Sequence, residues 1–280
     1  MSLRNGGKKN VILAAGVVAG ATIMGVILLL QGASAVAETR EGTFIVKCPP
    51  THVAQVDPIV NPGPAGTLSG HLHQFFANRS TASDSTLASM RAATTSCPVR
   101  GDTAGYWEPT LHRPDGSIIT PVTMFAYYKN KPVSYGTTQA FPPDFRMIAG
   151  GAIAPSRVFW DCFNGGGNFN YPPKCAAGDF TVSRIQFPNC WDGVRLDSSD
   201  HRSHVVYPVS NACPAAFPVK LPFVNFFIRY PPNTLGEAWK LSDGTTLPHA
   251  DFWQTWDQPR LEHFVDTCLK AGVNCAQIRD

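Results

Sequence analysis

Histidines close to acidic and aromatic residues are the side chains of this sequence best suited to chemistry. His71 and His73 stand two residues apart, so on a strand both imidazoles project from one face. The segment 201–204, with a histidine at each end, follows a run of aspartates, and His249 precedes Asp251 at the same two-residue spacing. Imidazole titrates near neutral pH and serves as acid, base or metal ligand, while a nearby carboxylate fixes its tautomer.

We predict that these three histidine groups converge in one solvent-reachable cleft. In that cleft His73 or His204 acts as the acid or base, and Asp192 or Asp251 is the partner carboxylate. The candidate catalytic residues are His71, His73, Asp84, Asp192, His204, His249 and Asp251. The alternative is that the histidines only tie loops together by hydrogen bonds.

Aromatic residues accompany the histidine groups and supply flat apolar platforms that suit sugar rings. The candidate substrate-binding residues are Trp107, Tyr128, Trp191 and Trp256. We therefore expect the cleft to hold a carbohydrate.

The spacing of the ligand-type residues argues against a metal ion or another cofactor. An H-x-H pair with a distant histidine could supply three zinc or copper ligands. A cupin-type site also needs a carboxylate a few residues after the pair, and the first one here is Asp84. The pair His249 and Asp251 resembles part of an iron facial triad, but the next histidine, His263, is too close to complete it. No G-x-S-x-G motif for a nucleophilic serine occurs either.

Eight cysteines predict a disulfide framework, because an even count in an exported chain is typical of one. The simplest pairing joins neighbours along the chain: Cys48–Cys97, Cys162–Cys175, Cys190–Cys213 and Cys268–Cys275. Short loops close most readily, so the last two or three pairs are the ones we expect. No C-x2-C pair is present, and the spacing does not suit a zinc ribbon.

Residues 1–37 have the pattern of a secretory signal peptide or an N-terminal membrane anchor. Three basic residues precede a charge-free apolar run over residues 11–30, and small residues then offer cleavage sites. A run of about 20 residues can cross a ~30 Å hydrocarbon core, so an uncleaved anchor stays open, and the protein would touch the membrane only there. In both cases residues 38–280 are expected to form a single extracellular domain.

Short β-like runs separated by turn residues predict a mainly-β domain rather than βαβ units. These runs cover residues 117–125, 145–153, 180–187, 205–209 and 224–230. Helical patterns are limited to 81–93 and to 260–271, which Gly272 would end. We predict a sandwich- or jelly-roll-like domain with long disulfide-braced loops and a short C-terminal helix.

Composition argues against nucleic acid as a partner. The net charge of +3 equals the three basic residues of the N-terminal segment, so the rest of the chain is close to neutral. It has no run of like charges and no basic patch of the kind that phosphate backbones require. The 24 glycines, 24 prolines and 11% aromatic residues are typical of a wall or matrix protein.

Seven sequence blocks resemble the domain of unknown function 1996 family, over about residues 48–268. The blocks are VDPIVNPGPAG, HLHQFFANRST, YWEPTLHRPDG, FRMIAGG, FPNCWDGVRLDSSDHRSHVVYP, CPAAFPVKLP and HADFWQTWD. Ala77, Asp144 and Ala250 stand where that family commonly has glycine, and none of these departures removes a titratable group. The family occurs in secreted actinobacterial and fungal proteins.

The resemblance implies an exported protein, and fungal relatives joined to carbohydrate-binding modules imply a polysaccharide partner. We predict a protein that acts on cell-wall or environmental polysaccharide by hydrolysis or β-elimination, without a cofactor. The alternative is a non-catalytic extracellular carbohydrate-binding or structural wall protein. If the cleft is catalytic, H73A and H204A should abolish activity and leave the melting temperature nearly unchanged.

Overall fold

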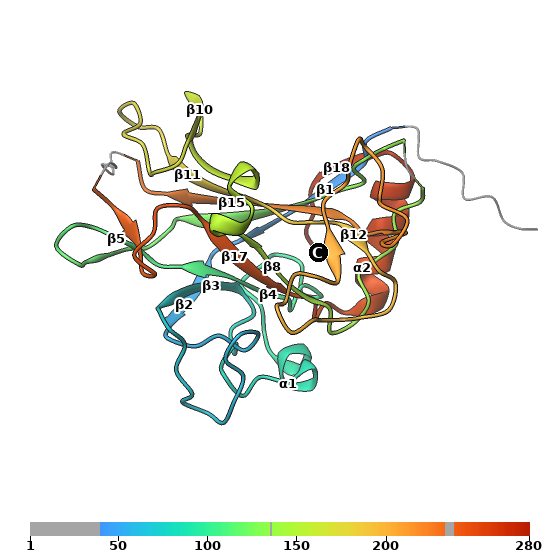
Figure 1. The fold of residues 1–280 in the computed structure, drawn as a ribbon, viewed down its shortest axis with the longest axis horizontal. Coiled ribbons are helices and arrows are strands. Elements are labelled where there is room, and N and C mark those ends of the chain that lie inside the picture. The colour runs from blue at the N-terminus through green and yellow to red at the C-terminus, as the bar shows by residue number, and fades with distance from the viewer. Residues whose placement is uncertain (1–39, 135, 233–237) are drawn as a thin grey trace, which may run out of the picture. The chain divides into compact units, whose positions relative to one another are not determined.

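The computed structural model describes residues 40–134, 136–232 and 238–280 (Figure 1). The chain divides into two units, residues 1–34 and 35–280, and every described residue belongs to the second. The segment expected to direct export lies outside the described residues. Among the described residues, no helix combines the length and apolar character needed to span a membrane.

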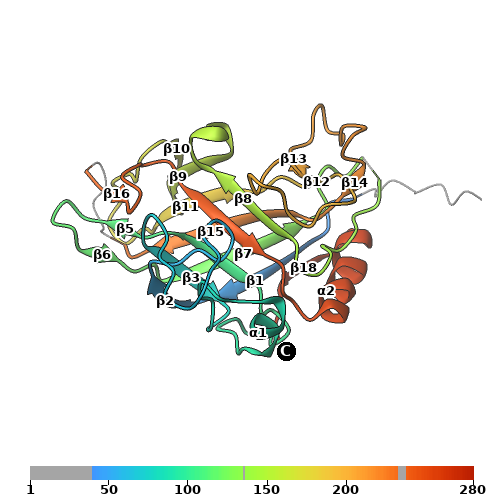
Figure 2. The same ribbon diagram turned by 60° about the horizontal axis from the view of Figure 1, so that its bottom comes forward.

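Two large β-sheets form the body of the described unit (Figures 1 and 2). The larger has the spatial order β10 (Gly166–Phe169), β9 (Val158–Cys162), β11 (Thr181–Gln186), β15 (Phe223–Tyr230), β7 (Thr123–Lys129), β1 (Thr43–Cys48) and β18 (Asn274–Gln277). The smaller has the order β2 (Pro50–Ala54), β3 (His73–Ala77), β4 (Gly105–Pro109), β17 (His249–Trp253) and β8 (Arg146–Gly150). The pairings are antiparallel, except that β1 and β18 run parallel.

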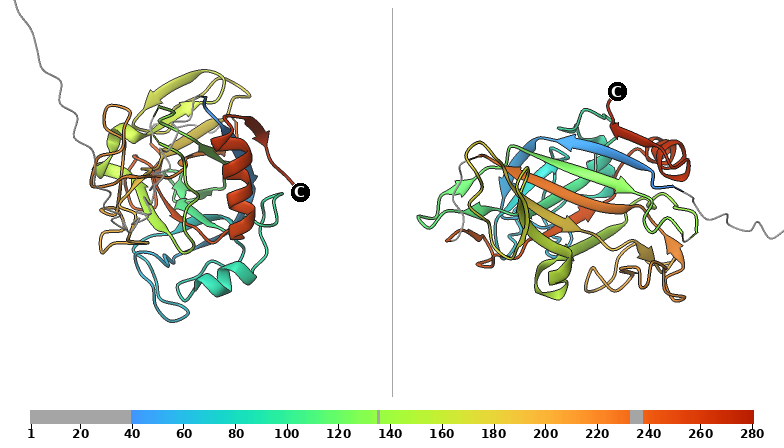
Figure 3. Two further views of the ribbon diagram at one scale, coloured as in Figure 1. Left: turned by 90° about the vertical axis from the view of Figure 1, so that its right-hand side faces the viewer. Right: turned by 90° about the horizontal axis from the view of Figure 1, so that it is seen from above.

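Short elements complete the unit. Two small sheets have the orders β13 (Val205–Val206), β12 (Cys190–Trp191), β14 (Val219–Lys220), and β16 (Lys240–Leu241), β5 (Leu111–His112), β6 (Ile118–Ile119). The helices are α1 (Leu87–Ala92), η1 (Gly151–Ile153), η2 (Pro155–Arg157), α2 (Gln258–Phe264) and its π-helical continuation η3 (Val265–Lys270). η3 lies beside β1 and β18 (Figure 3). The C-terminal helix is therefore present.

The main core lies between the two large sheets. Along β15 every second residue is buried, as the period of a strand requires when one face is covered. From β4, Tyr106 packs edge-on against Phe226 of β15 with ring centroids 5.3 Å apart. Its hydroxyl lies 2.7 Å from that of Tyr128 on β7. The predicted mainly-β, sandwich-like fold is confirmed.

The outer face of the five-stranded sheet is also covered. A second apolar cluster lies there, made of Ile59, Phe75, Met90, Trp107, Ile148 and Trp253. Ile59 comes from the loop before β3 and Met90 from α1, so the segment between β2 and β4 forms the cover. This face therefore offers both a dry environment and loops that can carry polar groups.

Four disulfides join the cysteines that are neighbours along the chain: Cys48–Cys97, Cys162–Cys175, Cys190–Cys213 and Cys268–Cys275. The simplest predicted pairing is confirmed in full, and no described cysteine is free. Such a framework is consistent with an extracellular protein, because disulfides persist in oxidising compartments.

Candidate functional site

Strand alternation places three of the candidate residues on the outer face of the five-stranded sheet. On β3, His73 shares its face with Phe75, a member of the outer apolar cluster. On β17, His249 and Asp251 share their face with Trp253, another member. β4 lies between these strands, so the two groups face the same space from either side of it.

The imidazoles of His71, His73 and His249 come together at this face. The ring centroid of His71 lies 4.4 Å from that of His73 and 5.4 Å from that of His249. One nitrogen from each ring lies within 4.8 Å of the other two. The first and third histidine groups of the sequence therefore converge, although about 175 residues separate them along the chain.

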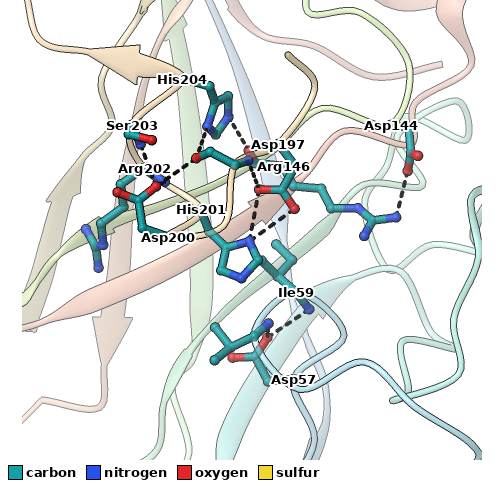
Figure 4. A network of polar contacts seen from close by, with 12 residues as sticks. Asp57, Ile59, Asp144, Arg146, Asp197, Asp200, His201, Arg202, Ser203 and His204 are labelled. Carbon is teal, nitrogen blue, oxygen red and sulfur yellow. Dashed lines mark hydrogen bonds and ion pairs between the residues drawn. The ribbon is translucent and has the colours of Figure 1, made fainter.

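Two buried aspartates complete the cluster. One oxygen each of Asp57 and Asp251 lies within 4.8 Å of the other and of a nitrogen of His73. Asp57 Oδ1 accepts hydrogen bonds from the backbone N–H groups of Ile59 (Figure 4) and Val60, both at 3.0 Å. This leaves Asp57 Oδ2 facing His73 Nε2 at 3.9 Å. Asp251 Oδ1 is buried and has no hydrogen-bond partner among the described residues.

Asp57 is absent from the candidates that the sequence analysis chose. It lies before the H-x-H pair, whereas the search for a carboxylate looked after the pair. The available signal was its position within the block VDPIVNPGPAG, which resembles the family.

Neighbouring acceptor oxygens indicate how two of the imidazoles are protonated. His73 Nδ1 lies 2.9 Å from the carbonyl oxygen of Val56, which can only accept, so Nδ1 carries the proton and Nε2 keeps a free lone pair. His249 Nδ1 lies 3.4 Å from a carboxylate oxygen of Asp243, which favours the same tautomer. The Nε2 atoms of His71 and His73 are buried and have no hydrogen-bond partner among the described residues.

Burial sets the charge of the cluster. It lowers the pKa of His73 to about 3 and that of His249 to about 4, so both rings are neutral at pH 7. Burial also raises the pKa of Asp57, and it raises that of Asp251 well above its usual value, with repulsion from Asp57 as a further cause. Neutral nitrogen bases and a proton-holding carboxyl group therefore lie next to one another.

A hollow of about 330 Å³ opens over this cluster, within the size range of small-ligand sites. It is lined by Asp57, Val60, Asn61, Ser69, Gly70, His71, Ile148, Arg202, His249 and Asp251. We call this hollow, together with His73 beneath it, the imidazole–carboxylate pocket. Arg202 gives its wall a positive charge and donates a hydrogen bond to the carbonyl of Ile148 at 3.1 Å.

A larger hollow of about 1060 Å³ has a different lining. Its cationic residues are Lys129, Lys131 and Arg157, and no described histidine or carboxylate lines it. It therefore lacks the groups that could transfer a proton near pH 7, and the smaller imidazole–carboxylate pocket is the candidate site.

Contrary to the prediction, His204 of the middle histidine group does not line the pocket. His204 is fully buried, and its ring nitrogens lie 2.9 Å from Ser198 Oγ and 2.7 Å from the carbonyl oxygen of Arg146 (Figure 4). Asp192 accepts from the backbone N–H groups of Val194 and Arg195 and so closes a turn. These residues brace a loop, and the loop contributes Arg202 to the pocket.

The other candidates lie elsewhere. Asp84 is exposed in the loop before α1. Trp107, Tyr128 and Trp256 are fully buried, so the expectation that they hold a sugar is wrong for the structure as packed. Trp191 is half-buried, and its Nε1 donates to the carbonyl of Arg195. Core packing, not ligand stacking, explains most of these aromatic residues.

The chain matches the family described as Domain of unknown function (DUF1996) over residues 57–256. This range contains Asp57, both members of the H-x-H pair, Arg202, His249 and Asp251. No curated protein and no solved structure matches the chain.

Proposed function

Since the chain belongs to the family described as Domain of unknown function (DUF1996), we propose its activity from the site itself. The protein acts outside the cytoplasm on polysaccharide, and the imidazole–carboxylate pocket is its catalytic centre. The observation that carries this proposal is the convergence of three imidazoles and two carboxyl groups beside a hollow of about 330 Å³.

The groups in the pocket favour β-elimination from a uronate-containing polysaccharide. Arg202 offers a cation for the uronate carboxylate. Asp57 accepts the proton from the carbon next to that carboxylate, and Asp251 gives its proton to the departing glycosidic oxygen. The C–O bond breaks as the new C=C bond forms, so the products are an unsaturated sugar end and a free hydroxyl.

Inverting hydrolysis fits the same groups less well. It places its two carboxyl groups about 6.5–9.5 Å apart to admit a water molecule. The nearest oxygens of Asp57 and Asp251 lie within 4.8 Å. Direct elimination needs no attacking water between them.

The test is incubation of the disulfide-bonded protein with neutral and uronate-containing polysaccharides. We expect unsaturated products from the uronate-containing ones, and loss of at least about 100-fold in kcat for Asp251→Asn, the contribution typical of a general acid. Asp84→Asn is the matched control, because this aspartate is exposed and outside the pocket. Binding without any product would instead identify a non-catalytic carbohydrate-binding protein, and reducing ends without unsaturation would identify a hydrolase.

A further inference from the structure

The imidazole–carboxylate pocket holds nitrogen donors that the proposed proton transfers do not use. We propose that His71, His73 and His249 bind one divalent transition-metal ion of the zinc type, with the carboxyl groups of Asp57 and Asp251 beside it. This inference rests on the proposed function in that it places the metal within the same catalytic pocket.

The geometry brings the three donors close to the separation that a shared ion requires. The nitrogens lie within 4.8 Å of one another. A zinc ion with Zn–N distances of about 2.0–2.1 Å holds tetrahedral ligands roughly 3.4 Å apart. Small side-chain rotations of His71, which precedes the strand, and of His249 can close that difference.

The ring nitrogens that would face away from the ion have the partners typical of metal-binding histidines. Such histidines usually donate their second ring N–H to a carbonyl or a carboxylate, which orients the ring. His73 has the carbonyl of Val56 in this position, and His249 has the carboxylate of Asp243.

Histidines elsewhere in the chain show what a purely structural role looks like. Both ring nitrogens of His52, His112 and His204 have hydrogen-bond partners. In contrast, the Nε2 atoms of His71 and His73 are buried without one among the described residues. A buried polar atom without a partner destabilises the folded state, and a bound cation would remove that cost at both nitrogens.

The donor set also selects the metal. Mg²⁺ and Ca²⁺ prefer oxygen ligands, whereas imidazole suits zinc, copper, nickel and iron. Three histidines with free space beside them are the arrangement of catalytic zinc sites, which keep one position open. In the proposed elimination, such an ion would neutralise the uronate carboxylate together with Arg202.

The experiment uses the full chain, exported with its disulfides and without a histidine tag. Metal is removed with a chelator, and Zn²⁺ alone is titrated while heat and metal content are measured. We expect one zinc per chain and a higher melting temperature with zinc, because an ion that binds only the folded state stabilises it. His73→Asn and His249→Asn should weaken zinc binding by more than about 100-fold, and Asp243→Asn by about 10- to 100-fold.

His112→Asn and His263→Asn are the controls, since neither residue lines the pocket, and both should keep the wild-type affinity. If a ligand variant fails to fold, Co²⁺ titrated into the wild-type protein gives an independent result, because a pocket-bound ion of low coordination number develops strong visible absorption. Absence of stoichiometric zinc, or zinc binding unchanged in both folded ligand variants, overturns the inference.

The two proposals can fail separately. Zinc binding without any action on polysaccharide would contradict the proposed function and leave the metal site in place. Elimination at full rate by the metal-free protein would overturn the metal inference and leave the proposed function in place.

Discussion

At the scale of single residues, hydrogen bonding separates the histidines into two kinds. His71 and His73 each keep a buried ring nitrogen without a partner among the described residues, whereas His204 uses both of its ring nitrogens. All three have the same candidate role in the sequence analysis. The difference arises from backbone carbonyls and hydroxyls that only the folded chain brings to each ring.

Replacement of His204 should therefore destabilise the folded protein. His204→Ala removes two partly buried hydrogen bonds and the packing against Phe145, whose ring centroid lies 5.0 Å away. We expect a loss of about 2–4 kcal/mol in the free energy of unfolding. Urea denaturation measures it, with His263→Ala as an exposed control that should change by less than about 0.5 kcal/mol. An unchanged midpoint for His204→Ala would contradict the bracing role.

Two of the positions where the family commonly has glycine have a backbone that explains the preference. Ala77 has φ of 58° and Asp144 has φ of 68°, in the left-handed region that non-glycine residues rarely adopt. Asp144 has a compensation, because its carboxylate accepts from Trp253 Nε1 at 2.7 Å and from Arg146 at 3.1 Å. Sequence comparison alone shows the departure but not this compensation.

The positive φ of Asp144 predicts the relative stability of two substitutions. Asp144→Gly and Asp144→Ala lose the same hydrogen bonds, but only alanine retains the left-handed strain. We expect the glycine variant to be more stable than the alanine variant by about 1 kcal/mol. Chemical denaturation of the pair measures this difference, and equal stabilities would show that the position carries no strain.

At the scale of elements, a buried carboxyl group connects the two large sheets. Glu108 on β4 accepts hydrogen bonds from Tyr230 on β15 at 2.5 Å and from Ser183 on β11 at 3.0 Å. Burial raises the pKa of Glu108 to about 8 despite these bonds, so the group is protonated in the folded protein at pH 7. In the unfolded chain it ionises near pH 4.3.

This difference predicts how stability depends on pH. Between about pH 4.3 and 8 the folded state holds a proton on Glu108 that the unfolded state has released, so the free energy of unfolding falls as pH rises. The stabilisation from protonated Glu108 should amount to a few kcal/mol in total. It should be complete below about pH 4.3 and be lost as the pH rises through about 8. Glu108→Gln should flatten the profile and be more stable than the wild type above pH 8. A wild-type profile that the substitution leaves unchanged would refute this origin.

Sequence periodicity predicted strands along which buried and more exposed residues alternate, and it missed a strand without this alternation. The runs 180–187 and 224–230 correspond to β11 and β15. Buried positions alternate along the whole of β15 and toward the end of β11. β3 is buried along its whole length because both faces of its sheet are covered, and the periodicity of the chain gave no strand there. The C-terminal helix, predicted over 260–271, begins two residues earlier because Asp257 caps it.

Part of the candidate site was also predictable from the two-residue period of side chains along a strand. The spacing of His249 with Asp251 indicates a common face of one strand, and both residues lie on β17. His71 and His73 also come together, although His71 precedes β3. Which pairs meet depends on the order of β3, β4 and β17, which no local pattern contains. Arg202 and Asp57 come from loops, so their approach to the pocket could not be predicted from periodicity.

At the scale of the whole molecule, the pocket is formed by groups from distant parts of the unit that covers residues 35–280. The loop before β3 gives Asp57, β17 gives His249 and Asp251, and the loop between β12 and β13 gives Arg202. An ion bound there would therefore connect β3 and β17, the first and last strands along the chain that contribute to the site. This is why metal binding should raise the stability of the whole unit and not only that of a loop.

The order of the disulfides has a consequence for biogenesis. Each cysteine is bonded to its immediate cysteine neighbour along the chain, so the four closed loops follow one another without interlocking. If the chain is exported as we propose, the polypeptide that emerges N-terminus first from a translocation channel presents each thiol with its native partner as the next one to appear. Oxidation in order of emergence yields the correct bridges, and reshuffling of wrong ones is not needed. We expect the yield of folded protein to depend on a thiol oxidase and to be unaffected by loss of a disulfide isomerase, which expression in hosts lacking one or the other would measure.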